Sequence, residues 1–184
     1  IKQAQPGDIV YWGSYEQDAV TANGKEDIAW VVLYDDSGRK LLLSQKSLDC
    51  LPYNETAGNT TWKACTLRTW LNDDFYWEAF NEEEQASLFY TAVTTLGSED
   101  TRDRVFLLSR EELELYNEYC VAAEPTDYAV RQGASAQRWW LRTPHIFHRD
   151  PSMEWADSIN DQDASLRNNK VEDGGIAVRP CIWV

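Results

Sequence analysis

The residues with the clearest chemical potential lie in the last third of the chain. The only two histidines, His145 and His148, are three positions apart, and Asp150 follows them. Imidazole and carboxylate groups are suitable metal donors, so this pattern could ligate a metal ion. The sequence shows no third or fourth ligand and no rigid scaffold for such a site. The three residues are equally well explained as exposed loop side chains that happen to be close in sequence. We therefore predict no metal site and no cofactor.

Other catalytic patterns are absent or uninformative. The sequence contains no phosphate-binding loop, no dinucleotide fingerprint, no H-E-x-x-H and no G-x-S-x-G. Carboxylates are so frequent that no single pair indicates acid–base catalysis. None of them follows the regular ligand spacing of a calcium-binding EF-hand loop. We predict that the protein is not an enzyme and has no catalytic residues.

The cysteines favour a structural role. None forms a C-x-x-C pair, and each lies in an apolar or helical context, where a free cysteine behaves as a small hydrophobic residue. A chain of 184 residues can bury a sizeable core without disulfides. We therefore expect buried, reduced thiols at all four positions, which are Cys50, Cys65, Cys120 and Cys181.

Composition narrows the classes of partner. The chain has 31 acidic against 17 basic residues and a formal net charge of −14, which would repel phosphate backbones. Nine Trp, nine Tyr and five Phe argue against disorder. No stretch approaches the roughly 20 apolar residues of a membrane helix. We predict no nucleic-acid binding and no membrane insertion. Because the chain begins at Ile1 without a signal-peptide pattern, we expect a processed product or an excised domain.

The elements that would position these residues can be read from periodicity and turn signals. The first third predicts strands over 8–15, 28–34 and 39–44, with a four-residue turn at 35–38 and a loop over 49–62. The middle third predicts helices that begin after Thr66, Asn81, Ser109 and Pro125, the third of them running to about Tyr119. A short strand is expected over 105–108.

The last third changes character. Residues 139–142 and 175–184 read as strands, whereas periodicity fails over 145–173. So long a loop in a compact domain suggests a functional region, and we expect at least one short strand within it, near 154–158. Without repeats or a linker, the sequence predicts one α+β domain over 1–184.

Several motifs, in order and spanning nearly the whole chain, carry a resemblance. They are Leu48-Asp49-Cys50-Leu51-Pro52-Tyr53-Asn54, Thr66-Leu67-Arg68-Thr69-Trp70-Leu71-Asn72, Val105-Phe106-Leu107-Leu108-Ser109, Trp139-Trp140-Leu141-Arg142-Thr143-Pro144 and Ala177-Val178-Arg179-Pro180. Together they resemble an uncharacterised domain family of gut Firmicutes and their phages. That family is similar to C-type-lectin-like proteins, among them formylglycine-generating enzymes and the variable proteins of diversity-generating retroelements.

The resemblance implies a C-type-lectin-like fold. In such a fold the N- and C-terminal strands pair, a twisted antiparallel sheet is flanked by two main helices, and a long irregular region precedes the C-terminal strand.

The resemblance also implies a function. In the variable proteins, a scaffold displays hypervariable residues for ligand binding, and diversity arises at adenines in Asn codons. Met153, Glu154, Trp155, Gln162 and Lys170 cannot arise from such codons and would belong to the fixed framework, with Trp155 as a binding floor. The implied ligand-binding residues of the region 145–171 are His145, Ile146, Phe147, His148, Arg149, Asp150, Trp155, Asp157, Ile159, Asn160, Asp161, Leu166, Arg167, Asn168 and Asn169.

Two alternatives stay open at this stage. One is a modifying enzyme like the formylglycine-generating group, although no matching pair of reactive thiols is evident. The other is a non-variable carbohydrate or adhesion domain, although the calcium–sugar motif of true C-type lectins is absent. The implied partner is a protein or a cell-surface ligand, with display on a phage particle or a bacterial cell surface as part of a larger protein. The sequence leaves the oligomeric state open.

Overall fold

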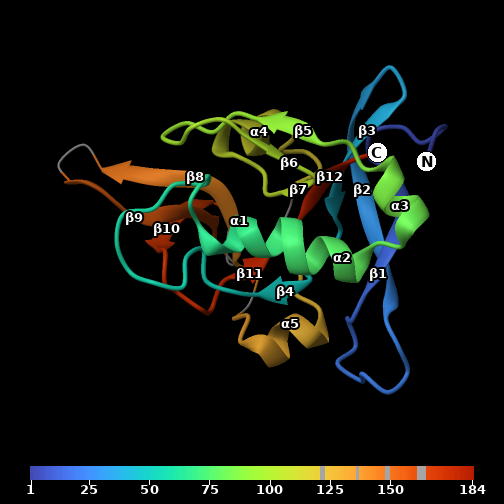
Figure 1. The fold of residues 1–184 in the computed structure, drawn as a ribbon, viewed down its shortest axis with the longest axis horizontal. Helices are drawn as coiled ribbons and strands as arrows, with labels where there is room; N and C mark the ends of the chain where they lie inside the picture. The colour runs from blue at the N-terminus through green and yellow to red at the C-terminus, as the bar shows by residue number, and fades with distance from the viewer. Residues whose placement is uncertain (121–122, 136, 148–149, 161–164) are drawn as a thin grey trace.

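The computed structural model describes residues 1–120, 123–135, 137–147, 150–160 and 165–184 (Figure 1). Within these ranges the chain forms two five-stranded sheets, a two-stranded hairpin and short helices. The α+β class expected from the sequence is confirmed. The expectation of a single antiparallel sheet beside two main helices is wrong, because the strands divide between two sheets and no one pair of helices dominates.

The first sheet gathers strands from both ends of the chain. Its order is β1-β2-β3-β12-β7, and every neighbouring pair is antiparallel. The terminal strands therefore share this sheet, but β12 pairs with β3 and β7, so the expected direct pairing with β1 is wrong. The strands are β1 (Ile9–Tyr15), β2 (Glu26–Asp36), β3 (Arg39–Ser44), β12 (Cys181–Trp183) and β7 (Val105–Phe106).

The hairpin β2–β3 follows directly from the sequence. Its apolar runs supply buried strand residues, and Leu42 lies between Val32 on one side and Ile182 on the other. The turn is shorter than predicted. Within this turn, Ser37 and Gly38 have positive φ angles, of 53° and 100°. Two successive residues with positive φ are what a two-residue hairpin turn requires.

The second sheet occupies the region that the sequence left without regular structure. Its order is β10-β9-β8-β11-β4, and only the β11–β8 pair is parallel. The long irregular region expected over 145–173 is wrong, whereas the expectation of at least one strand near 154–158 is confirmed, since that segment lies within a longer strand. The strands are β10 (Leu166–Lys170), β9 (Asp150–Ile159), β8 (Trp139–Phe147), β11 (Ala177–Val178) and β4 (Asp49–Cys50).

The last apolar segment serves both sheets. The sequence predicted one strand over 175–184, whereas β11 belongs to the second sheet and β12 to the first. Arg179 and Pro180 make the crossing between them. The Arg179 side chain is buried, and its Nε donates to the Ser44 carbonyl oxygen at 2.8 Å. The crossing is therefore tied to the end of β3.

The helices start where the sequence places their caps. Asn81 and Ser109 each close a capping box, and Thr126 caps the helix that ends at Gly133. Cys65, and not Thr66, is the first N-cap, and the helix after Ser109 ends at Leu115, short of Tyr119. The helical segments are α1 (Thr66–Trp70), the π-helical η1 (Leu71–Phe75), α2 (Tyr76–Ala79), α3 (Glu82–Ser87), α4 (Arg110–Leu115) and α5 (Asp127–Gln132).

The tryptophans divide between core and surface. Trp30, Trp139 and Trp140 are fully buried, as expected for scaffold residues, whereas Trp70 and Trp183 are only partly buried. The hairpin β5 (Thr91–Val93) and β6 (Thr101–Asp103) lies beside this core. Among the described residues, no helix is long and apolar enough to cross a membrane.

Candidate functional site

The three strands β8, β9 and β10 arrange the predicted binding residues in rows. Trp155 pairs with His145 on one side and with Lys170 on the other, so these three side chains share one face of the sheet. The next row on that face holds Asp157 opposite Asn168. Trp155, His145 and Asn168 are partly exposed. We refer to this surface as the β8–β10 face.

A charged network occupies the row of the β8–β10 face next to Trp155, where α4 covers Asp157. Asp157 is fully buried and accepts two hydrogen bonds from Arg110, at 2.8 Å from Nε and 2.8 Å from Nη2. His145 Nδ1 lies 2.8 Å from the same carboxylate. His145 Nδ1 also lies 3.2 Å from Arg110 Nη2, and Nε2 lies 3.5 Å from the Asn168 amide nitrogen. These contacts with Asp157, Arg110 and Asn168 fix the orientation of the His145 ring.

Arg110 is a site residue that sequence reasoning missed. It is the first residue of α4, directly after the Ser109 cap, and its backbone nitrogen donates to the Thr143 hydroxyl at 2.9 Å. A positive side chain at a helix N-terminus opposes the helix dipole. That unfavourable position was the available signal that Arg110 has a partner elsewhere, and the partner is Asp157.

Two predicted binding residues are buried, and their assignment to the surface is wrong. Asp157 is 0% exposed because Arg110 and His145 cover its carboxylate. Ile159 is 1% exposed because it pairs with Trp139 and packs in the core. Neither side chain can reach a ligand while the sheet keeps this register.

Two further predicted residues lie on the opposite side of the sheet. Since side chains alternate along a strand, Arg167 and Asn169 point away from the β8–β10 face. Asn169 accepts from the Ser158 hydroxyl at 2.8 Å and donates to Asp173 at 3.2 Å, so it braces the chain after β10. These two positions do not join the candidate site.

The other predicted positions are distributed around this surface. Leu166 lies on the face at the start of β10, and Asn160 follows the end of β9; both are partly exposed. Ile146 and Phe147 belong to β8 and Asp150 to β9, with Phe147 opposite Asp150 in the register. The remaining three predicted positions lie outside the described residues: His148, Arg149 and Asp161.

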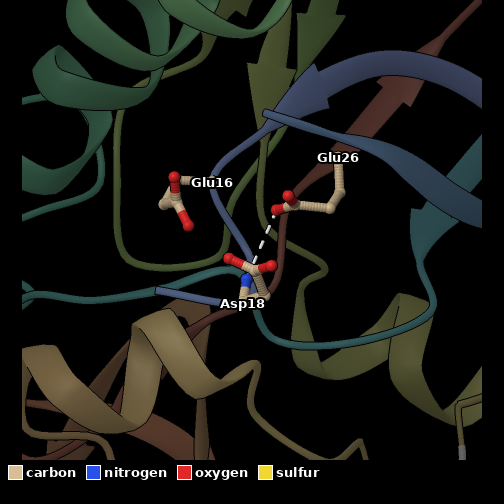
Figure 2. A group of neighbouring side chains, drawn as sticks. All are labelled: Glu16, Asp18 and Glu26. Atoms are coloured by element: carbon tan, nitrogen blue, oxygen red, sulfur yellow. Dashed lines mark hydrogen bonds between the residues drawn. The ribbon is translucent and has the colours of Figure 1, made fainter. Parts of the chain in front are cut away.

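An acidic cluster lies where the loop after β1 meets the start of β2, far from this face in sequence. Figure 2 shows Glu16, Asp18 and Glu26 with carboxylates turned toward one another; one oxygen of each lies within 4.8 Å of the others. Each carboxylate already accepts a backbone hydrogen bond, from Val20 to the first two and from Gln17 to Glu26. The hydrogen bond from the Asn23 amide is the main cause of the lowered pKa of Asp18. We assign the cluster to loop closure.

A groove of about 600 Å³ runs between the loop 94–100 and α4, with Arg142 at its floor. The Arg142 guanidinium donates to both carboxylate oxygens of Glu112, to the Thr95 hydroxyl and to the carbonyl oxygens of Thr94 and Leu107. All five of its N–H donors are therefore occupied by the protein itself. Arg142 braces β8 and has no donor left for a ligand.

The four cysteines are free and buried, as expected. Burial raises the pKa of Cys50 and of Cys65 to about 12 and that of Cys120 to about 11. Burial also holds the pKa of Cys181 well above its usual range. Because the thiolate is the reactive form, these thiols are poor nucleophiles at neutral pH.

Comparison with known proteins gives one match. Residues 37–184 match a family described as "Domain of unknown function (DUF6273)". The match covers both sheets apart from β1 and β2, and it includes the whole β8–β10 face. No curated protein and no solved structure matches the chain.

Proposed function

The chain belongs to the DUF6273 family, whose description assigns no activity, and from its surface we propose that it is a ligand-binding module. Its ligand is a protein, recognised through the β8–β10 face. The observation that carries the proposal is the row of His145, Trp155 and Lys170, held side by side and next to the ion pair of buried Asp157 with partly exposed Arg110.

The β8–β10 face combines a rigid backbone with exposed side chains of different chemical types. Binding is strongest when little side-chain and backbone freedom is lost on docking. The bidentate pair of Arg110 and Asp157 fixes α4 to β9, and three hydrogen-bonded strands fix the spacing of the exposed side chains. Trp155 is the aromatic anchor on this floor, since tryptophan is enriched among residues that dominate interface energy.

We also propose that the module has a C-type-lectin-like scaffold with hypervariable positions. The return of β12 to the sheet that holds β1 supports this fold, as does the insertion of β8–β10 before the last strand. Buried Asp157 and Ile159 belong to the framework in this proposal. The exchangeable positions on the described part of the face are then His145, Leu166 and Asn168.

The raised thiol pKa values favour binding over the alternative of a thiol-dependent modifying enzyme. Such an enzyme needs accessible, reactive cysteines, whereas Cys50, Cys65, Cys120 and Cys181 are all buried. The carbohydrate alternative becomes an outcome of the test below.

Two matched libraries test the proposal. In the first, His145, Leu166 and Asn168 are randomised together; in the second, Asp157 and Ile159 are randomised. Both libraries are displayed on yeast and sorted for folded chains, then for binding to a labelled test protein and to a labelled oligosaccharide. We expect the first library to retain folded members and to yield protein binders that lose affinity on Trp155→Ala.

The second library should be depleted of folded members, because its positions are buried. Equal loss of folding in both libraries would overturn the assignment of a display surface. Recovery of oligosaccharide binders alone would favour the carbohydrate alternative. Independently, hypervariability requires a near-duplicate template segment beside the gene that differs only at adenines; mismatches at other bases would exclude it.

A further inference from the structure

We propose a second interaction surface, separate from the β8–β10 face, that docks an acidic segment of a partner protein. It is built from alternating aromatic and arginine side chains of α2, the segment before β5, and β6 with the residue that follows it. Figure 1 labels these three elements, α2, β5 and β6. We call it the arginine ladder, and its members are Trp77, Tyr76, Arg104, Tyr90 and Arg102.

The ladder is continuous. The rings of Trp77 and Tyr76 have centroids 5.1 Å apart. The Arg104 guanidinium carbon lies 5.2 Å from the ring centroid of Tyr76 and 4.9 Å from that of Tyr90. Arg102 lies 5.1 Å from the Tyr90 centroid. All three cation–ring distances are within the roughly 6 Å over which a cation is attracted to a ring face.

The ladder is exposed at its most apolar members. Trp77 is 67% exposed and Tyr90 is 50% exposed. Exposed apolar surface that is contiguous with polar groups is typical of an interaction site. The sequence signal for this surface was weak, because the members come from three separate segments.

The two arginines keep their charge without a carboxylate partner. In a chain with 31 acidic residues, neither Arg102 nor Arg104 forms an ion pair with any residue that the structure describes. The neighbouring acid, Asp103, turns inward and pairs with Arg68 instead. The guanidinium groups are thus positive charges stacked on rings, with N–H donors that a carboxylate can accept from in a bidentate manner.

The backbone holds this arrangement in advance of binding. The Arg104 nitrogen donates to the Asn72 side-chain oxygen at 2.8 Å, which fixes the end of β6 against η1. Arg102 is paired with Ala92 across the β5–β6 hairpin, and its Nη2 donates to the Tyr90 carbonyl oxygen at 3.2 Å. A surface ordered in this way loses little conformational freedom when a partner docks.

The chemistry selects an acidic protein segment. Trp, Tyr and Arg are the residues most enriched among those that dominate protein interfaces, and Arg102 and Arg104 call for carboxylates. A nucleic acid has one phosphate per nucleotide along its whole length, and the ladder has only two arginines to neutralise them. At physiological salt the repulsion between a short acidic peptide and distant acids is screened beyond about 8 Å, while direct contacts persist.

The test uses a fluorescein-labelled peptide of alternating Glu and Leu, 12 residues long, and measures its polarisation with the full chain in 0.15 M NaCl. We expect saturable binding that weakens about tenfold or more in the double variant Arg102→Ala/Arg104→Ala, since two charge-assisted contacts are lost. A second variant, Trp77→Ala, should weaken binding with an unchanged melting temperature, because Trp77 is mostly exposed. If the double variant fails to fold, the Trp77→Ala variant still tests the proposal.

The matched control is Lys2→Ala/Lys46→Ala, which removes the same net charge at two exposed lysines away from the ladder. We expect this control to bind like the unmodified chain. An equal loss in the control, or no binding of the peptide by the unmodified chain, overturns the proposal. Tighter binding of a 12-nucleotide oligothymidine than of the peptide also overturns it, in favour of a nucleic-acid surface. None of these outcomes depends on the β8–β10 face.

Discussion

Both sheets of this protein bury apolar side chains, but they differ in the ionic groups that they bury beside them. In the first sheet, neighbouring strands bury apolar side chains such as Val32, Leu42 and Ile182. The one buried ionic side chain of β2 and β3, Lys40, pairs with Asp35 within that hairpin. In the second sheet, buried Arg142 and buried Asp157 pair instead with partly exposed residues of α4, which are Glu112 and Arg110. The hydrophobic effect does not depend on the orientation of the buried groups, whereas a buried charge is stable only when its partner is correctly placed. The second sheet is therefore the part in which geometry is specified by individual residues.

The largest expected effect comes from removing the cationic partner of the buried Asp157 carboxylate. Arg110→Ala leaves the Asp157 carboxylate buried without its cation, and we expect the free energy of unfolding to fall by about 3–5 kcal/mol. Urea denaturation measures the change. The control is Lys170→Ala, an exposed position of the same sheet, with an expected change within about 0.5 kcal/mol. If both variants lose the same stability, the Arg110–Asp157 ion pair does not stabilise the second sheet.

The first sheet should respond to lost apolar volume. Leu42→Ala removes a fully buried side chain between two strands, and we expect a loss of about 2–5 kcal/mol in the same urea assay. Tyr11→Ala, on β1 of that sheet, is the control, because Tyr11 is exposed. A Leu42→Ala variant as stable as Tyr11→Ala would remove the basis for the comparison between the sheets.

A smaller, pH-dependent effect is expected where the two sheets meet. The Tyr15 hydroxyl of β1 donates to Asp49 of β4 at 2.6 Å, and burial raises the pKa of Asp49. Because the folded state then binds its proton more tightly than the unfolded state, ionisation of Asp49 reduces stability as pH rises above about 4.

We therefore expect Asp49→Asn, which has no carboxyl proton to lose, to gain stability relative to the unmodified chain between pH 4 and pH 7. Chemical denaturation at several pH values tests this. Parallel stability curves for the two proteins would show that Asp49 has the same pKa in both states.

The smallest expected effect is an absence of reaction. With buried thiols and raised pKa values, the folded chain should not react with a thiol-specific reagent at pH 7, whereas all four cysteines should react after denaturation. Fast reaction of Cys50 in the folded chain would show that the second sheet opens at β4. It would also revive the thiol-enzyme alternative.

The first sheet was easier to predict from the sequence than the second, because the second buries polar residues within its strands. The hairpin β2–β3 was predictable because its buried residues are apolar and its turn contains Gly38. Strand β9 was not recognised along its length, because its buried positions include Asp157 and Ser158, which hide the alternation of apolar and polar residues. Polar residues that are buried in pairs read as loop residues in a sequence.

The candidate site was predictable in part for a related reason. The region 145–171 was identified, and His145, Trp155 and Asn168 do share a face. Arg167 and Asn169 could not be separated from Asn168 without the register of β10, which decides the side of the sheet for each residue. Arg110 belongs to a distant helix and was outside any local pattern. Whether the face binds a ligand stays a prediction.

The crossing at Arg179 and Pro180 has a consequence for the order of folding. Strand β12 must insert between β3 and β7, and Cys181 meets Leu43, 138 residues earlier (181 − 43). Strand β11 likewise closes the second sheet by pairing with β4 and β8. Contacts so distant in sequence are formed only after the intervening chain has lost much of its freedom, which slows folding. We expect both sheets to be completed late and together, as the same short segment closes each of them.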